Sequence, residues 1–240
     1  MDRKALTTGL LGILFGLGGG VAMAAGDDAV FYRRQASYFS RHNQLDKAIE
    51  AYTKAIELDP GATVVYLDRA GAEMRNGDST AALADLDIVG KSENKNLASM
   101  GFSLKVTLLT SGENLKEALS TCDTWVKSCP EEFEARISRA DLLEKMDQKS
   151  KAVPDLEAAV KLLGESLEKS QDANLFSMRG KLYERLGMIE SAQKDWRAAL
   201  KLYLSQRGIV PLRTMRELSK KVGDPDLIQA VNERAQSFGL

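Results

Sequence analysis

The stretch from Ala29 to Ala62, AVFYRRQASYFSRHNQLDKAIEAYTKAIELDPGA, contains two amphipathic segments separated by a short polar break. Apolar residues recur at spacings of three and four in both segments, which places each set on one face of an α-helix. The break, Arg41 to Gln44, contains an asparagine, a residue that tolerates the left-handed conformation in which many helices end. Pro60 ends the second segment, because proline cannot continue a helix. The stretch therefore predicts a pair of short helices.

Small residues, Ala36, Ala48 and Ala55, lie where these two helices would cross. Small side chains let two backbones approach closely enough for the helices to pack ridge into groove. A single pair this short could not bury its apolar face, so the pattern predicts further pairs beside it.

This stretch resembles a tetratricopeptide repeat, a helix–turn–helix unit of about 34 residues. With Ala29 as position 1, the matching residues at positions 4, 8, 11, 20, 24, 27 and 32 are Tyr32, Ala36, Phe39, Ala48, Tyr52, Ala55 and Pro60. The stretch departs from the family pattern at Gln35, where leucine is usual, and at Asn43, where glycine is usual. The resemblance implies an all-α fold, a right-handed superhelical α-solenoid of antiparallel helix pairs.

Four further units follow, over residues 63–96, 99–132, 133–165 and 173–206. The solenoid is thus expected over residues 29–207. Trp125 replaces a usual small residue in the third unit, which predicts either a core filler or an exposed anchor for a partner. Pro154 lies inside the second helix of the fourth unit, near its first turn if Ser150 is the N-cap. Residues 164–172 break the period and predict either a longer helix or a surface loop.

Residues 208–240 are expected to form C-terminal capping helices. Pro211 and Pro225 lie at the predicted starts of two helices, where proline is common. These helices lack the repeat pattern, and the end of a solenoid needs a cap with a polar outer face.

Residues 1–24 are expected to be an export signal peptide. Two basic residues precede an apolar run, and Ala22-Met23-Ala24 has the small-residue pattern of a cleavage site. Cleavage would leave residues 25–28 as a short tail and a periplasmic or secreted protein. The alternative is an N-terminal membrane anchor, since residues 5–25 carry no charge and are about long enough to span a bilayer.

Composition argues against several kinds of site. The 240 residues carry a formal net charge of −1, so no nucleic-acid partner is expected, since that would require a basic surface. The single histidine, His42, is expected to be an exposed turn residue. Cys122 and Cys129 are about 10.5 Å apart along a predicted helix, too far for a disulfide, and are expected to be small buried side chains. No catalytic residue, metal site or cofactor is predicted.

The remaining candidate is a binding surface. In the family that this chain resembles, the first helix of each repeat lines a concave groove, which implies a protein or peptide partner. The residues carried over to this groove are Arg33, Ser37, Arg41, Leu67, Met74, Arg75 and Met100. Arginine could bind a partner's carboxylate through forked hydrogen bonds, with leucine and methionine supplying apolar contact. The alternative for the arginines is an ordinary solvated surface.

The sequence therefore predicts a non-catalytic scaffold that binds a polypeptide outside the cytoplasm. The alternative is a structural or self-associating subunit of an envelope or secretion assembly. The oligomeric state is left open by these patterns.

Overall fold

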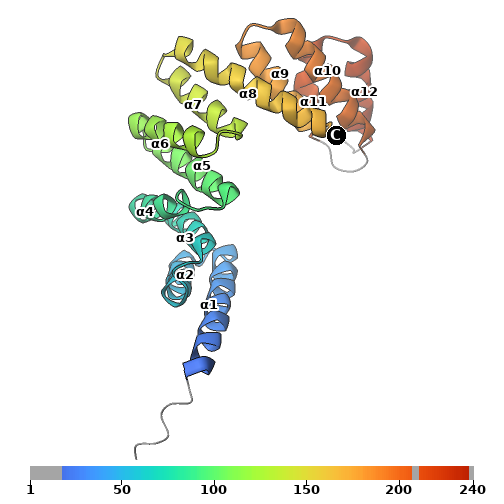
Figure 1. Cartoon of the computed structure of the whole chain (residues 1–240). Helices are drawn as coiled ribbons and strands as arrows, with labels where there is room; N and C mark the ends of the chain where they lie inside the picture. Colours follow the sequence, from blue (N-terminus) through green and yellow to red (C-terminus); the bar gives the residue numbers. More distant parts are fainter. Residues whose placement is uncertain (1–17, 207–210, 238–240) are drawn as a thin grey trace, which may run out of the picture. The chain divides into compact units, whose positions relative to one another are not determined.

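The computed structural model describes residues 18–206 and 211–237, and every regular element in that part of the chain is an α-helix (Figure 1). In chain order, the helices are α1 (Gly18–Arg41), α2 (Leu45–Leu58), α3 (Thr63–Asn76), α4 (Ser79–Val89), α5 (Lys95–Ser111), α6 (Leu115–Ser128), α7 (Phe133–Lys145), α8 (Lys149–Lys169), α9 (Ala173–Arg185), α10 (Ile189–Ser205), α11 (Leu212–Val222) and α12 (Pro225–Gln236).

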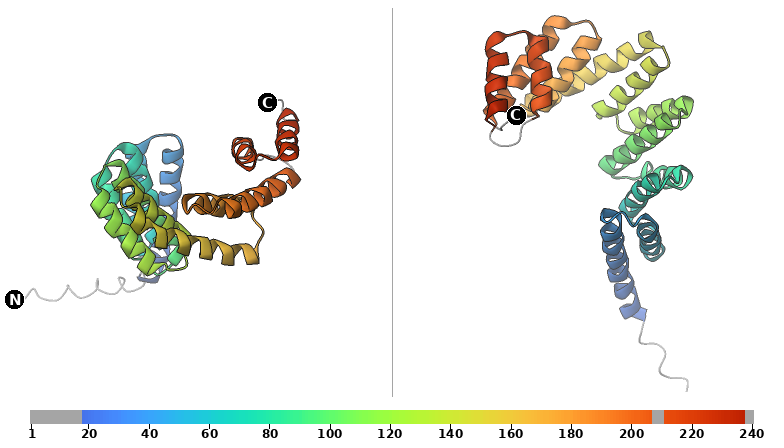
Figure 2. Two further views of the ribbon diagram at one scale, coloured as in Figure 1. Left: turned by 90° about the horizontal axis from the view of Figure 1, so that it is seen from above. Right: turned by 180° about the vertical axis from the view of Figure 1, so that it is seen from behind.

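The chain divides into two compact units, residues 1–108 and 109–240, with the boundary inside α5. Within the first unit, α1 packs on α2, α2 on α3 and α3 on α4. Within the second unit, each helix from α6 to α12 packs on the next one along the chain, and Figure 2 shows these neighbours from two further directions. The predicted all-α fold of consecutive helix pairs is confirmed.

The turn inside each of the five predicted helix pairs passes through a residue with positive φ, always at position 15 of the unit. These residues are Asn43 (φ 57°), Gly77 (85°), Glu113 (59°), Asp147 (58°) and Gly187 (75°). Glycine adopts this conformation without strain, and Asn or Asp adopts it more readily than other residues. The turns predicted from Asn43 and Gly77 are confirmed, whereas Glu113 carries no such signal in the sequence.

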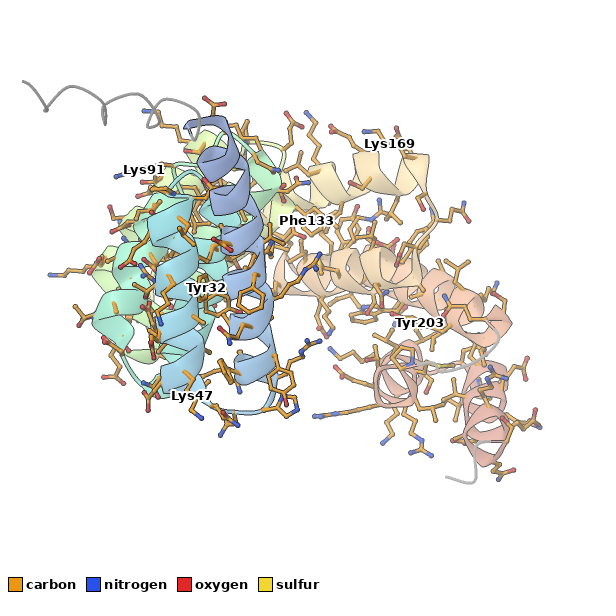
Figure 3. The ribbon with its side chains drawn as sticks, turned by 90° about the horizontal axis from the view of Figure 1, so that it is seen from below. Tyr32, Lys47, Lys91, Phe133, Lys169 and Tyr203 are labelled. Carbon is orange, nitrogen blue, oxygen red and sulfur yellow. The ribbon has the colours of Figure 1, made fainter. Side chains whose placement is uncertain are left out.

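Small residues are buried where paired helices cross. Ala36, Ala48 and Ala55 pack in one apolar cluster, and Tyr32, labelled in Figure 3, extends from α1 against that cluster. At the same crossing in the fifth pair, a Cβ atom on Gly180 would overlap the indole ring of Trp196. Close approach of the two helices therefore requires the small residues that the sequence pattern placed there.

The structure decides between two alternatives in the middle of the chain and corrects one prediction. Trp125 is buried, so it is a core filler and the interpretation as an exposed anchor is wrong. Most of residues 164–172 lie in α8, which continues to Lys169. The N-cap of α8 is Gln148 and not Ser150, so Pro154 is the sixth residue of the helix. Its ring leaves the carbonyl of Ser150 without the usual helical donor.

The first helix begins earlier than the sequence pattern suggested. Residues 25–28, expected as a tail, are helical and continuous with the rest of α1, and no proline interrupts residues 18–28. The predicted cleavage bond, between Ala24 and Ala25, therefore falls inside α1. The rest of the predicted signal peptide, residues 1–17, lies outside the described residues. No helix in residues 18–206 and 211–237 is long and apolar enough to cross a bilayer.

Two helices follow the last repeat, as predicted, although residues 208–210 and 238–240 of the predicted cap lie outside the described residues. α11 packs on α10, and α12 packs on both. Met215, Leu218, Val222 and Val231 of these helices join the apolar cluster of α10. The exposed side of α12 is polar and includes Asp226, Gln229, Asn232, Glu233 and Gln236.

Candidate interaction surface

Two polar cross-links join α3 to α1 and the turn after it, one near the middle of α3 and one near its C-terminal end. Arg33 donates from Nε to Asp68 Oδ2 at 2.9 Å. Arg75 donates from Nη1 to Ser40 Oγ at 2.9 Å and from Nη2 to Asn43 Oδ1 at 3.0 Å. The pairs Arg33–Asp68 and Arg75–Ser40 both join residues 35 positions apart in sequence, which is the register of two parallel helices side by side.

Between the cross-links, the facing side chains of α1 and α3 are small. Ser37 donates from Oγ to the carbonyl of Arg33 at 3.0 Å and lies 3.4 Å from the hydroxyl of Tyr52. On α3, a Cβ atom added to Gly71 would meet no atom within 4 Å, so open space lies above this glycine. Asp68 and Arg75 are about 10 Å apart along the helix axis, roughly the length of three residues of extended chain. We call this surface, formed by Arg33, Ser37, Arg41, Asp68, Gly71 and Arg75, the α1–α3 face.

The α1–α3 face carries positive charge that is only partly neutralised. Arg33 is paired with Asp68, but the partners of Arg75 are a hydroxyl, a carbonyl and an amide oxygen. Arg41 is exposed and donates from Nε to the carbonyl of Ser37 at 3.3 Å. Hydrogen bonds to neutral oxygens leave the guanidinium charge uncompensated, so both groups keep the capacity to bind a carboxylate.

The predicted groove residues differ in how the structure uses them. Ser37, Arg41 and Arg75 come together on the α1–α3 face, and Met100 on α5 is 54% exposed. Leu67 is instead buried in the cluster that α3 forms with Ala82 and Leu86 of α4, so it is not offered to a partner. Met74 is half-buried against the same cluster.

Comparison with known proteins identifies the repeat. Residues 33–91 match the family model for the tetratricopeptide repeat. The chain contains tetratricopeptide repeats. No curated protein matches its sequence.

Solved structures of other proteins have the same fold. The structure of pilF from Pseudomonas aeruginosa has a TM-score of 0.57 and 13% identity, over 91% of this repeat protein and 93% of that chain. A MamA double mutant from RS-1 has a TM-score of 0.52 and 18% identity, over 77% of this chain and 99% of the MamA chain. A further MamA structure has a TM-score of 0.52 and 17% identity, over 78% and 100%. At these identities the similarity concerns the fold alone.

Three of the repeats contain the same buried ion pair, which the sequence analysis missed. An arginine at position 7 donates two hydrogen bonds to an aspartate at position 23, on the second helix of its own repeat. The pairs are Arg69–Asp85, Arg139–Asp155 and Arg179–Asp195, each 16 residues apart, with N–O distances between 2.7 and 2.9 Å. The ion pair has a signal in the sequence. An arginine is followed by alanine or glycine, and 16 residues after the arginine comes the aspartate of an Ala-x-x-Asp motif.

Two of these arginines also reach the preceding repeat. Arg69 donates from Nη1 to Thr53 Oγ1 at 3.0 Å, and Arg139 donates from Nη1 to Asp123 Oδ1 at 2.8 Å. Both acceptors lie at position 25 of the repeat before. At position 7, where leucine is usual, these two repeats have an arginine that hydrogen-bonds to the second helix of its own repeat and to the second helix of the repeat before.

Glu73 is a buried acid at position 11 of the second repeat, where the other repeats have a large apolar or aromatic residue. It is 5% exposed, its Oε1 lies 3.6 Å from Arg69 Nε, and its Oε2 has no hydrogen-bond partner. Burial, together with the negative charge of Asp85, raises the pKa of Glu73 from 4.5 to about 7. One arginine therefore serves two buried carboxyl groups.

The histidine and cysteines lie where they were expected. His42 is exposed, and its Nδ1 is 2.8 Å from the carbonyl oxygen of Tyr38. Cys122 and Cys129 are buried and not bridged. Burial raises the pKa of the Cys122 thiol to about 12. Within residues 18–206 and 211–237, no three His, Cys, Asp or Glu side chains gather in a way that could hold a metal ion.

Proposed function

We propose that this repeat protein is a non-catalytic scaffold that binds an extended segment of a partner polypeptide on its α1–α3 face. The observation that supports this most directly is the open space above Gly71, between the two cross-links and beside Arg75. A glycine in the middle of a helix weakens that helix, and it lets another backbone approach closely. Among the described residues, no atom lies within 4 Å of the position that a Cβ atom on Gly71 would take.

The chemistry of the face favours an acidic segment. Arg41 and Arg75 hold only neutral oxygens, so a carboxylate on the partner would gain charge-assisted hydrogen bonds without displacing an acidic group of the protein. Arg33 is unsuited to this role because Asp68 already occupies it. The distance between the cross-links accommodates about three residues of the partner.

The proposed site of action is outside the cytoplasm. The support for it is the basic start, the apolar run and the small-residue cleavage pattern of residues 1–24. Cleavage before Ala25 would shorten α1 to residues 25–41 and leave the whole α1–α3 face in place. Edman sequencing of protein purified from the native compartment tests this part, with Ala25 as the expected first residue. An intact N-terminus would favour the membrane anchor.

The binding test compares three variants in affinity purification from the native compartment, with quantitative mass spectrometry. Gly71→Leu places a side chain in the open space, and Arg75→Glu reverses the charge beside it. Lys194→Glu, an equal charge reversal at an exposed position on α10, is the matched control. Gly71→Leu should not weaken the fold, since leaving glycine gains roughly 0.5–1 kcal/mol of helix propensity.

We expect the wild type and Lys194→Glu to recover the same set of proteins. Gly71→Leu and Arg75→Glu should reduce the recovery of these proteins at least about tenfold, which is the effect of losing one desolvated charge pair or of filling the contact surface. Undiminished recovery with Gly71→Leu, at an unchanged or higher melting temperature, would refute binding on the α1–α3 face.

A further inference from the structure

A second surface of α1 exposes large apolar side chains. Phe31 is 58% exposed and Tyr38 is 51% exposed, and Val30 lies beside them at 50%. Arg34 is exposed between the two aromatic residues. These residues recur at helical spacing, so they form one continuous stripe along α1, which we call the α1 end stripe.

The same positions are buried or half-buried in the repeats that follow. Phe31 and Tyr38 occupy positions 3 and 10 of the first repeat. In α3 those positions are Val65 and Ala72, which are 3% and 1% exposed because they pack in one cluster with α2, the second helix of the preceding repeat. In α7 they are Ala135 and Leu142, which are also buried. The α1 end stripe is therefore a repeat-stacking face that no described helix covers.

The residues of the stripe specify what would fit against it. The side of α2 that covers Val65 and Ala72 is rich in alanine, including Ala48, Ala51 and Ala55. Because Phe31 and Tyr38 are larger than Val65 and Ala72, a helix that covers the stripe needs residues at least as small as these alanines. From Ala29 to Leu45 the chain contains no Asp or Glu, and among the described residues Arg34 has no ion-pair partner, so the covering helix should also carry an acidic residue.

A second copy of the chain fits this surface poorly. Pairing of two α1 end stripes would bring the Arg34 side chains of both copies into one interface, where like charges repel. Stacking on the far end of another copy would bury the polar side of α12, including Gln229 and Asn232, without partners for its amides.

We infer that the α1 end stripe binds an amphipathic helix of a different protein, one with small residues on its apolar side and an acidic residue beside them, in the place of a preceding repeat. The inference is independent of the proposed function, because Gly71 and Arg75 lie outside the stripe. Helix-on-helix packing of this kind is a common mode of peptide recognition.

The test uses two synthetic peptides of about 15 residues, stapled to hold a helix because short peptides are marginally helical. Both have alanine along one side, and they differ only in flanking Glu or Lys. Fluorescence anisotropy measures their binding to the full chain. We expect the Glu peptide to bind about tenfold more tightly than the Lys peptide, and Arg34→Glu to reverse this preference.

Two variants separate this surface from the rest. Phe31→Ser/Tyr38→Ser, at exposed positions and checked by circular dichroism, should abolish binding of both peptides. Gly71→Leu, which blocks the α1–α3 face, should leave it unchanged. The inference is overturned if neither peptide binds, if both bind equally, or if sedimentation velocity shows a dimer that Phe31→Ser/Tyr38→Ser dissociates, since the occupant would then be a second copy.

Discussion

Replacing Glu73 by glutamine should stabilise the second repeat above neutral pH and have little effect near pH 5. The carboxyl group is buried between α3 and α4, where the charged groups that face it are Arg69 on its own helix, Asp85 on α4 and Asp78 at the start of α4. Two of these three are acidic. Ionised Glu73 would therefore add a third negative charge around one arginine, whereas glutamine has nearly the same shape and stays neutral at every pH.

The size of the effect follows from the pKa of Glu73, which folding raises from 4.5 to about 7. Below pH 4.5 the carboxyl is protonated in both the folded and the unfolded chain, so its contribution is constant. Between 4.5 and about 7 it ionises only in the unfolded chain, and each unit of pH removes about 1.4 kcal/mol of folding stability. Above about 7 it is ionised in both states. The loss over this window of roughly 2.5 units is about 3 kcal/mol.

Hydrogen exchange of the α3 and α4 amides, followed by mass spectrometry between about pH 5 and pH 8, measures this loss where it occurs. After correction for the intrinsic pH dependence of exchange, the opening free energy of the wild type should fall with pH and that of Glu73→Gln should stay level. Glu57→Gln, at an exposed position on α2, is the matched control and should follow the wild type. Parallel curves for wild type and Glu73→Gln would refute the assignment of a raised pKa to Glu73.

Three further predictions concern the second unit. Gly180→Ala should lower stability by about 1–3 kcal/mol in urea unfolding, because its Cβ overlaps Trp196, and an unchanged midpoint would contradict the close crossing. Arg139→Ala should cost about 3 kcal/mol by the same measurement, since it leaves Asp155 charged and buried; a loss below about 1 kcal/mol would place this pair among ordinary surface ion pairs. The Cys122 thiol, with its pKa raised to about 12, should resist a thiol reagent at pH 8 until the protein is unfolded, and rapid labelling of the folded protein would contradict its burial.

The helix pairs could be predicted from the sequence because their signals are local and repeat. Spacings of three and four define each apolar side, and Asn43 or Gly77 marks a turn, and the structure has two helices in each of the five predicted units. The start of α1 could not be predicted this way. Ala22, Met23 and Ala24 serve both as a cleavage pattern and as good helix formers, and no proline follows them to separate the two roles.

Side-chain pairing could not be predicted, because it depends on which helices become neighbours. Arg69 stands at position 7, where leucine is usual, and only the packing of α3 on α4 brings it to Asp85. Nothing local in the sequence distinguishes Glu73 from the charged residues of an exposed helix surface. Leu67 was assigned to the groove by its position, yet α3 is turned so that this side chain meets α4.

The same position of the repeat also has different roles at the two ends of the chain. Position 13 is Arg75 in the second repeat and Arg185 in the fifth. Arg75 binds neutral oxygens, whereas Arg185 contacts Asp141 at 2.8 Å and Glu144 at 3.1 Å. Beside it, Glu184 is bound by Lys221 of α11 at 2.6 Å. Arg185 and Glu184 thus have charged partners within the second unit, whereas Arg41 and Arg75 bind only neutral oxygens. A partner carboxylate would have to displace an acidic side chain at Arg185 but not at Arg75, which is why we assign binding to the N-terminal repeats.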